Sequence, residues 1–428
     1  MKKFLIAILC VLLVAVMAVA CGKAEKKEEA PQEITTDVSA YQYEGDFILA
    51  KHILTQEGID ALPKKHKDMT VDEMRDTVVQ FYLYSKQVVW TAGNTLKYTV
   101  SDSHGNSQLN PGISYQGFHY ESKATGNIYR LMDFMDPETG VVDVAKMGEN
   151  PMLSGNQCSS STFWAWARVM NSSTNYLYTR YMNRSRNFIP IGDYTYDFEI
   201  EEWLDTYGTR EVVNDNGEQK MFECYALTKP ADGFVYCNGG IGHTIIATGE
   251  TVVVRNEDGT INGEKSYIIY SDQNQVTRPD TNEEGDQFIA FGKYNNQRTF
   301  QKLFDGHYIP FTFKEFIGED PIEDTEVSCS HSGETITKEQ LFSTKITANY
   351  AISDSFAAVY NEKGVEVYKV AVHAAFPSIY EMTITCDNAN KDTTVWGSWD
   401  NVKSGYTVKI SVQLGTGERP TLWEGKLA

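Results

Sequence analysis

The sequence predicts an α+β fold for most of the chain and an all-β module at its C-terminal end. Apolar residues recur at helical spacing over residues 70–90, and a second apolar helix is expected at 158–170. Short β-rich runs occupy residues 233–273, and beyond residue 318 apolar residues recur at every second position. Since helices and strands occupy separate stretches, helices packed on a sheet are expected, followed by a β-sandwich over residues 318–428.

The N-terminus carries the pattern of an export signal. Lys2 and Lys3 precede an apolar run at 4–19, and Ala18-Val19-Ala20 leads into Cys21. The run is short for a transmembrane helix and is followed by a polar Lys/Glu stretch. A cysteine at this place resembles the bacterial lipobox, with alanine in place of the usual leucine. The resemblance implies a lipoprotein signal peptide at 1–21, a lipid attached to Cys21, and a position on the extracellular face of the bacterial cell membrane.

Composition limits the remaining possibilities. Residues 22–43 are rich in Lys and Glu and poor in apolar side chains, so they are expected to form a flexible tether. The net charge of −20 gives no basic face for nucleic acid, and nucleic acid is therefore excluded as a partner.

The cysteines indicate one thiol that needs an explanation. Cys10 leaves with the signal and Cys21 carries the lipid, so five of the seven remain. Their odd number leaves at least one thiol unpaired. Pairing Cys224 with Cys237 and Cys329 with Cys386 would spare Cys158, although sequence alone does not fix the connectivity. No CxxC or HExxH spacing occurs, so neither a metal nor a cofactor is expected.

The predicted elements follow in chain order. Thr70-Val71-Asp72-Glu73 is a capping-box pattern that opens the helix expected to reach Trp90. Residues 100–125 are expected to form loops and short strands. In the helix at 158–170, Trp164 and Trp166 are expected in the core. Strands are expected at four places, with a turn at Asp258-Gly259 between the third and the fourth: 234–236, 243–247, 251–255 and 267–271. The acidic stretch 280–286 is interpreted as a solvated loop and 319–326 as a linker.

Cys158 is the candidate nucleophile. Polar residues 155–157 precede it, small hydroxyl residues follow it, and it begins the apolar helix. The free N–H groups and positive dipole end of a helix favour a thiolate over a thiol. The alternative is a buried structural cysteine.

His243 and two polar residues after the next strand complete the candidate constellation. His243 begins a strand directly after a glycine-rich turn, where its ring could face Cys158. Asp272 could orient the ring as the third member of a triad, and Asn274, two residues on and on the same face, competes for this role. The alternatives are a histidine satisfied at a strand end and an ordinary polar strand end.

Four short motifs resemble the papain-like cell-wall hydrolases of the NlpC and CHAP types. They are GNQCSSSTFWAWARV at 155–169, LTKPADGFVYCNGGIGHTII at 227–246, YSDQN at 270–274 and YQGFHY at 115–120. The chain departs from the family pattern where Gln157 stands for Asp and Ser160 for Gly. The resemblance implies a papain-like domain at 44–317, with helices packed on an antiparallel sheet and an insertion at 171–228. It also implies that Tyr120 and Gln157 border the substrate.

The implied activity is hydrolysis of amide bonds in peptidoglycan stem peptides, or in another peptide substrate. Cys158 would attack the carbonyl, His243 would transfer the proton, and Asp272 or Asn274 would fix the tautomer. A transglutaminase-like enzyme has the same residue order, but Thr244-Ile245 replaces the small residue and tryptophan that follow its histidine. A non-catalytic surface lipoprotein that binds cell wall or a partner is the third possibility.

Overall fold

The structure is a computed structural model of the whole chain, and it describes residues 52–101, 104–170, 179, 188–195, 208–238, 241–281, 287–375, 379–386 and 392–428. The signal peptide, Cys21, the tether, residues 282–286 of the acidic stretch and much of the insertion lie outside these ranges. The described residues belong to one compact unit. Helices and sheets are both present, which confirms the α+β class. None of the described helices is long and apolar enough to cross a membrane.

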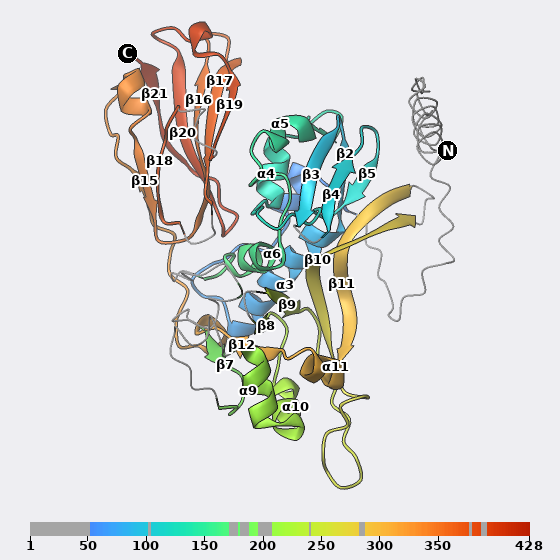
Figure 1. Ribbon diagram of the computed structural model, residues 1–428. Helices are drawn as coiled ribbons and strands as arrows, with labels where there is room; N and C mark the ends of the chain where they lie inside the picture. Colours follow the sequence, from blue (N-terminus) through green and yellow to red (C-terminus); the bar gives the residue numbers. More distant parts are fainter. Residues whose placement is uncertain are drawn as a thin grey trace, which may run out of the picture. The chain divides into compact units, whose positions relative to one another are not determined.

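The main sheet is largely antiparallel and is built from strands distant in sequence. Its order is β1-β2-β5-β11-β10-β9-β8-β12-β7, with β6 paired to β2. β8 to β11 form successive antiparallel pairs, and Figure 1 shows β10 and β11 as long paired strands. The strands are β1 (His52–Ile53), β2 (Val88–Ala92), β5 (Ser114–Gln116), β6 (Val141–Val142), β7 (Ile189–Pro190), β8 (Gly233–Asn238), β9 (Ile241–Ala247), β10 (Tyr267–Thr281), β11 (Gln287–Thr299) and β12 (Ile309–Thr312).

The longest described helix, α3 (Val71–Gln87), begins where the sequence predicts. Thr70 Oγ1 accepts from the Glu73 N–H at 3.2 Å, and the Thr70 N–H donates to the Glu73 carboxylate at 2.7 Å. The expected end at Trp90 is wrong, since the helix stops at Gln87. The following β-branched and aromatic residues suit a strand, and β2 pairs there with β5.

Short helices surround α3 and the sheet. The central one is α6 (Cys158–Trp166), which packs against α3, β9 and β10. The others in this part of the chain are α2 (Gln56–Asp60), α4 (Ile128–Asp133), α5 (Val144–Gly148), α9 (Thr209–Asn216), α10 (Glu218–Ala226), α11 (Phe300–Asp305) and the 3₁₀ turn η2 (Glu315–Ile317). A separate hairpin consists of β3 (Leu96–Ser101) and β4 (Gly105–Leu109).

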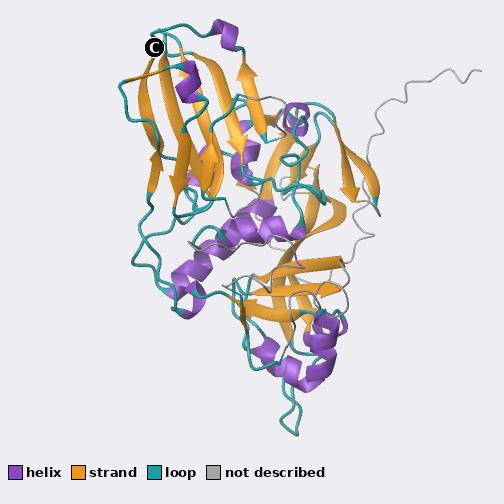
Figure 2. Ribbon diagram, turned by 60° about the vertical axis from the view of Figure 1, so that its left-hand side comes forward, coloured by secondary structure: helices purple, strands orange, loops and turns teal. Residues whose placement is uncertain are grey.

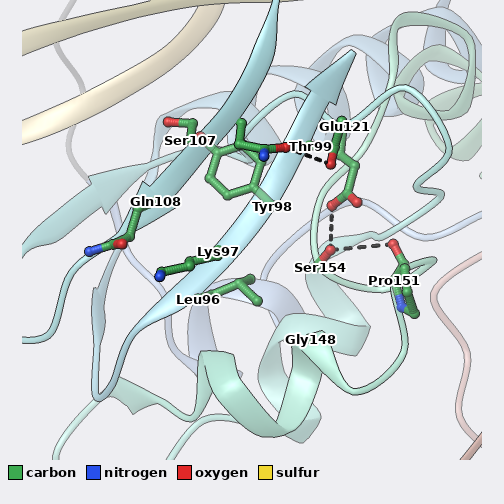
Figure 3. Close-up of a pocket in the computed structure, with 11 residues that line it drawn as sticks. Leu96, Lys97, Tyr98, Thr99, Ser107, Gln108, Glu121, Gly148, Pro151 and Ser154 are labelled. Atoms are coloured by element: carbon green, nitrogen blue, oxygen red, sulfur yellow. Dashed lines mark hydrogen bonds between the residues drawn. The ribbon is translucent and has the colours of Figure 1, made fainter. Parts of the chain in front are cut away.

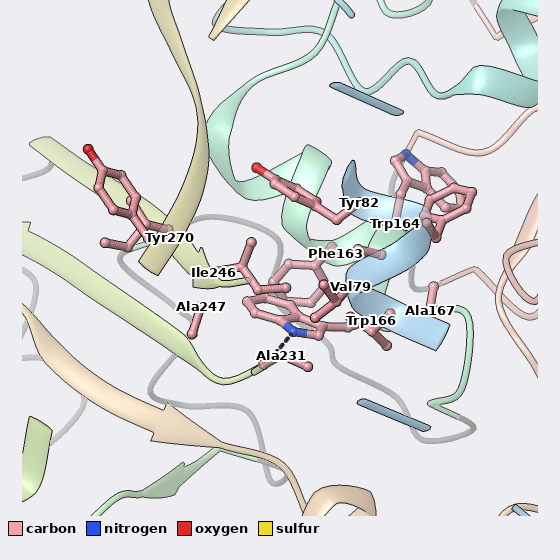
Figure 4. Packing of buried hydrophobic residues seen from close by; sticks show 14 of the residues in the cluster. Val79, Tyr82, Phe163, Trp164, Trp166, Ala167, Ala231, Ile246, Ala247 and Tyr270 are labelled. Atoms are coloured by element: carbon pink, nitrogen blue, oxygen red, sulfur yellow. Dashed lines mark hydrogen bonds between the residues drawn. The ribbon is translucent and has the colours of Figure 1, made fainter. Parts of the chain in front are cut away.

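The tryptophans of α6 lie in the core, as predicted. Trp164 and Trp166 are 2% and 0% exposed. Figure 4 shows Trp166 beside Ile246 of β9 and Ala231, and its indole N–H donates to the Ala231 carbonyl at 2.9 Å. The Trp164 indole N–H donates to the Thr125 carbonyl at 2.8 Å. Each indole therefore buries its apolar ring and satisfies its polar atom, which anchors α6 under the sheet.

Three of the four predicted strands in 233–273 are present, and the prediction at 251–255 is wrong. That segment makes only isolated bridges, Val252 with Tyr267 and Arg255 with Ile261. The Val254 N–H donates to the Ser266 hydroxyl at 2.8 Å, so a side chain occupies a place in the ladder. The turn is present, with Gly259 at a φ of 86°.

The C-terminal part of the chain forms two β-sheets. One has the order β14-β21-β20-β16-β17-β19 and the other the order β13-β15-β18; Figure 2 shows these strands in orange. Apolar side chains of both sheets form one core cluster, with Ile346 of β15 and Met382 of β18 beside Val370 and Ile410. The elements are β13 (Val327–Cys329), β14 (Thr335–Ile336), α12 (Lys338–Leu341), β15 (Lys345–Ala348), β16 (Ile352–Tyr360), β17 (Glu366–His373), β18 (Glu381–Thr383), β19 (Thr393–Gly397), the 3₁₀ turn η3 (Trp399–Asn401), β20 (Thr407–Leu414) and β21 (Thr421–Leu427).

The expected disulfides are absent from the described residues. None of the five cysteines beyond Cys21 forms a disulfide. The Cys224 thiol is buried on α10 and accepts backbone N–H groups from Asp193 and Tyr194. The Cys329 thiol donates to the His331 carbonyl at 3.4 Å, while Cys386 is exposed. The proposed pairing is therefore wrong, because the thiols of Cys224 and Cys329 face backbone groups instead.

Candidate active site

Cys158 is the first residue of α6 and is 4% exposed. The helix start is fixed by Ser160, whose hydroxyl accepts the Gln157 N–H at 3.0 Å and donates to the Ala124 carbonyl at 3.2 Å. The first N–H groups of a helix have no acceptor within the helix. The thiol accordingly accepts the backbone N–H of Ser159, together with that of Thr244 on β9.

His243 and Asp272 meet across the β9–β10 pair. His243 Nε2 lies 2.9 Å from Asp272 Oδ2. Strand β10 pairs with β9 through Tyr270 and Ser271, and its register against β11 shifts between Tyr270 and Asp272. Such an irregularity re-aims side chains, and here it coincides with the point at which the carboxylate reaches the imidazole.

The choice between Asp272 and Asn274 is resolved by their contacts. Asp272 bonds to the ring, and the Asn274 amide donates to the other carboxylate oxygen, Asp272 Oδ1, at 3.0 Å. Asn274 therefore orients the carboxylate that orients the imidazole. The two sequence candidates occupy successive places in one chain of hydrogen bonds.

The thiol of Cys158 is hydrogen-bonded to the His243 ring. Since Nε2 is held by Asp272, the nitrogen that faces the sulfur is Nδ1. Burial alone raises the pKa of Cys158, but the hydrogen bond and charge of His243, with the two backbone N–H groups, bring this pKa below its ordinary value. The sulfur is therefore disposed to be a thiolate.

The pKa of His243 is shifted upward, in the direction opposite to that of Cys158. Burial alone lowers the pKa of His243, yet Tyr308, Asp272 and Cys158 together raise this pKa well above its ordinary value. Burial likewise raises the pKa of Asp272, and the hydrogen bond and charge of His243 bring that pKa below its usual range. The group therefore favours a thiolate, an imidazolium and a carboxylate in sequence.

A pocket of about 550 Å³ opens beside this group. Its lining includes Tyr120, His243, Asp272, Asn274 and Arg298. The Tyr120 hydroxyl is hydrogen-bonded to the Cys158 thiol, and burial is the main cause that raises its pKa. Tyr120 thus lies both in the pocket lining and beside the sulfur.

Gln157, the other residue predicted to contact substrate, differs from Tyr120 in its position relative to the pocket. It caps α6 in extended backbone and is 7% exposed. Among the described residues, those that line the pocket do not include it. The structure therefore brings together Cys158, His243, Asp272, Asn274 and Tyr120. Gln157 precedes α6 and is not among the described residues that line the pocket.

A buried lysine lies close to the group and was not predicted. Lys86, at the end of α3, is 1% exposed and its ammonium contacts the Gln273 side-chain oxygen. The Gln273 amide donates to the Phe118 carbonyl at 2.7 Å. Burial lowers the pKa of Lys86 to about 7, against the opposing charges of Asp272 and Cys158. A signal existed, since Lys86 continues the apolar series Met74, Val78 and Tyr82 at intervals of four residues.

A larger pocket, of about 730 Å³, lies along the β3–β4 hairpin. Figure 3 shows Glu121 and Ser154 at its wall, where the Ser154 hydroxyl donates to the Glu121 carboxylate. Behind this wall His119 is fully buried, with Nε2 3.7 Å from Glu121 Oε2. The Ser154 hydroxyl is thus bonded to a carboxylate and lies 3.3 Å from the Pro151 carbonyl, whereas the smaller pocket adjoins a thiol that is bonded to an imidazole.

The described residues contain no cluster of three or more His, Cys, Asp or Glu side chains that could bind a metal ion. Comparison of the chain with protein-family models gives no match, and comparison with curated proteins gives no significant match.

Proposed function

We propose that the chain is a membrane-anchored extracellular cysteine peptidase or amidase that cleaves amide bonds in peptidoglycan stem peptides. The observation that carries the proposal is the Cys158–His243–Asp272 group, with 2.9 Å between His243 Nε2 and Asp272 Oδ2 and the thiol at the start of a helix. A thiol, a base and a group that orients the base are what nucleophilic acyl transfer requires.

The domain assignment is part of the proposal. Residues 44–317 are a papain-like domain of the NlpC or CHAP kind, and residues 318–428 are a β-sandwich accessory domain. The position of the thiol at a helix start and of the imidazole on an adjoining antiparallel strand supports the first assignment. The shared core of the two C-terminal sheets supports the second. The signal pattern and Cys21 support export and lipid anchoring.

The reaction proceeds in two acyl-transfer steps. The Cys158 thiolate attacks the amide carbonyl carbon, and the imidazolium of His243 gives its proton to the leaving amine as the C–N bond breaks. The acyl group is then held as a thioester on Cys158. His243 next takes a proton from water, the hydroxide attacks the thioester, and the carboxylic acid leaves with the thiolate restored. Asp272 keeps Nδ1 of the ring directed at the sulfur throughout.

Two donors serve the oxyanion. The backbone N–H of Cys158 is at the first helical position, where no intrahelical acceptor exists. The Tyr120 hydroxyl adjoins the sulfur, and its raised pKa keeps it a protonated donor. Donors placed at a developing oxyanion are among the largest contributions to acyl transfer.

Purified cell wall is the substrate that tests the proposal. The mature protein should release stem-peptide fragments, detected by mass spectrometry, while Cys158→Ala and His243→Ala release none and keep the circular dichroism spectrum of the folded protein. Cys386→Ala, which removes an exposed thiol of the C-terminal part, is the matched control and should retain activity. Equal release by Cys158→Ala would contradict the proposal.

A further inference from the structure

The pocket beside the catalytic group contains a cation that the reaction above does not use. Arg298 lies on β11, opposite Ile268 of β10, and lines the pocket together with Tyr120 and His243. Its guanidinium lies 4.9 Å from the ring centroid of Tyr270 and 5.0 Å from that of Tyr308. Both hydroxyls also hydrogen-bond to it. Two aromatic side chains therefore hold this guanidinium in a fixed place.

The charge of Arg298 is not neutralised locally. Among the described residues, no carboxylate lies within ion-pair distance of it, and Asp272, whose charge reaches it, is already bonded to His243 and Asn274. The other titratable lining groups are His104, His243 and Tyr120. A guanidinium has five N–H donors, more than two hydroxyls can accept. Donors and positive charge therefore remain for a ligand.

The ligand that matches this arrangement is a carboxylate. A guanidinium accommodates a carboxylate with two parallel hydrogen bonds. A chain with a net charge of −20 repels anions in general, so a fixed cation inside one pocket provides a local and selective attraction. Stem peptides carry free carboxylates at their C-terminus and at branch residues, so such a group can lie near the scissile amide.

We propose that Arg298 binds a free carboxylate of the substrate, so that the preferred substrates are amides with a carboxylate close to the bond that is cleaved. This inference rests on the proposed function and adds a substrate class to it. In this arrangement Arg298 is a specificity-determining residue, and the carboxylate enters the pocket that Tyr120 and His243 also line.

Paired thiol reagents test the anion site without any hydrolysis. Maleimides with a carboxylate on one, two or three methylenes are compared with their carboxamide counterparts, and the rate of Cys158 modification is measured by mass spectrometry. In the wild type the carboxylate should be favoured at one or more lengths, and Arg298→Gln should reduce that preference about ten-fold, the effect of losing one charge-assisted hydrogen bond. Arg255→Gln, which removes a surface arginine paired with Glu223 at 2.8 Å, is the charge-matched control and should keep the preference.

The outcomes separate this inference from the proposed function. A preference that is the same in wild type and Arg298→Gln at every length overturns the inference, as does an equal slowing of both reagents, which would mean that Arg298 acts only through Asp272. An Arg298-dependent preference without any wall cleavage supports the carboxylate site and overturns the hydrolase proposal. A Cys158 that no reagent modifies contradicts both.

Peptide substrates then identify the source of the carboxylate. Stem peptides with a free or amidated branch carboxylate are compared with peptides that have a free or amidated C-terminus. The free form of one pair should have about a ten-fold lower KM in the wild type but not in Arg298→Gln. Cleavage that is indifferent to amidation in both pairs overturns the inference.

Discussion

At the scale of single residues, the site depends on a competition between burial and polar contacts. Cys158 and Asp272 are buried and the His243 side chain is 22% exposed, and burial alone would shift the pKa of each toward the uncharged form. Their hydrogen bonds reverse that tendency, since every charged form is stabilised by the next group in the series. We therefore expect the sulfur to be reactive because its neighbours are arranged in this order, whereas a lone buried cysteine would be inert.

The separate contacts of Asp272 and Asn274 lead to a prediction. Asp272→Asn removes the charge that stabilises the imidazolium and admits the wrong ring tautomer, so kcat should fall by about 10³–10⁴-fold. Asn274→Ala removes only one hydrogen bond to the carboxylate and should lower kcat by about ten-fold. Steady-state kinetics on a stem peptide measures both. A larger loss for Asn274→Ala than for Asp272→Asn would contradict the assigned order.

The sequence could identify Cys158, His243 and Asp272, but it could not identify the residues that surround them in the pocket. Cys158, His243 and Asp272 are marked by local context: a helix start, a glycine turn and a polar strand end. Arg298 has no such mark, because it reaches the pocket through the pairing of β10 with β11, and no strand was expected at 287–299. Gln157 was assigned by its place beside the cysteine, and in the structure it precedes α6 in extended backbone and is not among the described residues that line the pocket.

At the scale of elements, α3 and β10 are joined by a buried polar link. The Lys86 ammonium contacts Gln273, which donates to the Phe118 carbonyl, so the end of α3 is tied to the residue after Asp272. The ammonium also lies 5.1 Å from the ring centroid of Tyr82. This link holds the strand that carries the Asp272 carboxylate, and it requires the burial of a cation, which is unfavourable.

The unfavourable free energy of burying this cation can be measured from the pH dependence of stability. The pKa of Lys86 is about 7 in the folded chain, against about 10.4 for a lysine in an unfolded chain. Between these values the unfolded chain binds more protons, so this group lowers stability fully below pH 7 and progressively less as the pH rises toward 10. Lys86→Met should therefore raise the unfolding free energy at pH 6 by about 1–3 kcal/mol, net of the lost Gln273 partner, and by less at pH 10.

Urea unfolding at the two pH values measures this difference. Lys67→Met, which removes an exposed lysine 3.7 Å from Asp324, is the control and should have a small effect at both pH values. An equal destabilisation by Lys86→Met at pH 6 and pH 10 would contradict the account of the link.

Element types were easier to predict than element ends. The capping box located the start of α3, and the apolar run located α6, because both signals are local. The end of α3 was missed because residues 88–90 continue the apolar spacing and their partner strand β5 is distant in sequence. The segment 251–255 has strand-like residues, but Ser266 takes the place of a ladder bond.

At the scale of the whole described chain, a buried ion pair joins the part that carries Cys158 to the C-terminal sheets. Arg130 of α4 contacts Asp354 of β16 at 2.9 Å, and Asp354 lies 2.6 Å from His373 Nδ1. Arg130 also donates to the carbonyls of Ser353 and Ala374 at 2.9 and 2.7 Å. All three side chains are essentially unexposed. The C-terminal sheets therefore share a satisfied polar core with the part that carries Cys158.

Breaking that pair should be costly. Asp354→Asn leaves the Arg130 charge uncompensated, so the unfolding free energy should fall by about 3–5 kcal/mol, while Asp400→Asn on the exposed turn η3 should change it little. Burial raises the pKa of Asp354, but the charge of Arg130 and the hydrogen bond of His373 bring this pKa below its usual range. Its contribution is therefore complete above about pH 4, the unfolded value, and is lost as the pH falls further. Urea unfolding that is unchanged in Asp354→Asn would contradict this account.

The pH dependence of Cys158 modification tests the central claim most directly. A neutral alkylating reagent is applied from pH 4 to pH 10, with a short unstructured cysteine peptide, whose thiol has a pKa of about 8.5, as the reference. Because the His243 hydrogen bond lowers the pKa of Cys158, the wild-type rate should stay high well below the pH at which the reference slows. In His243→Ala, only the two backbone N–H groups still oppose the effect of burial, and the rate at pH 7 should fall by ten-fold or more. A wild-type profile that follows the reference thiol, or one that His243→Ala leaves unchanged, would contradict the claim that the sulfur gives its proton to the ring.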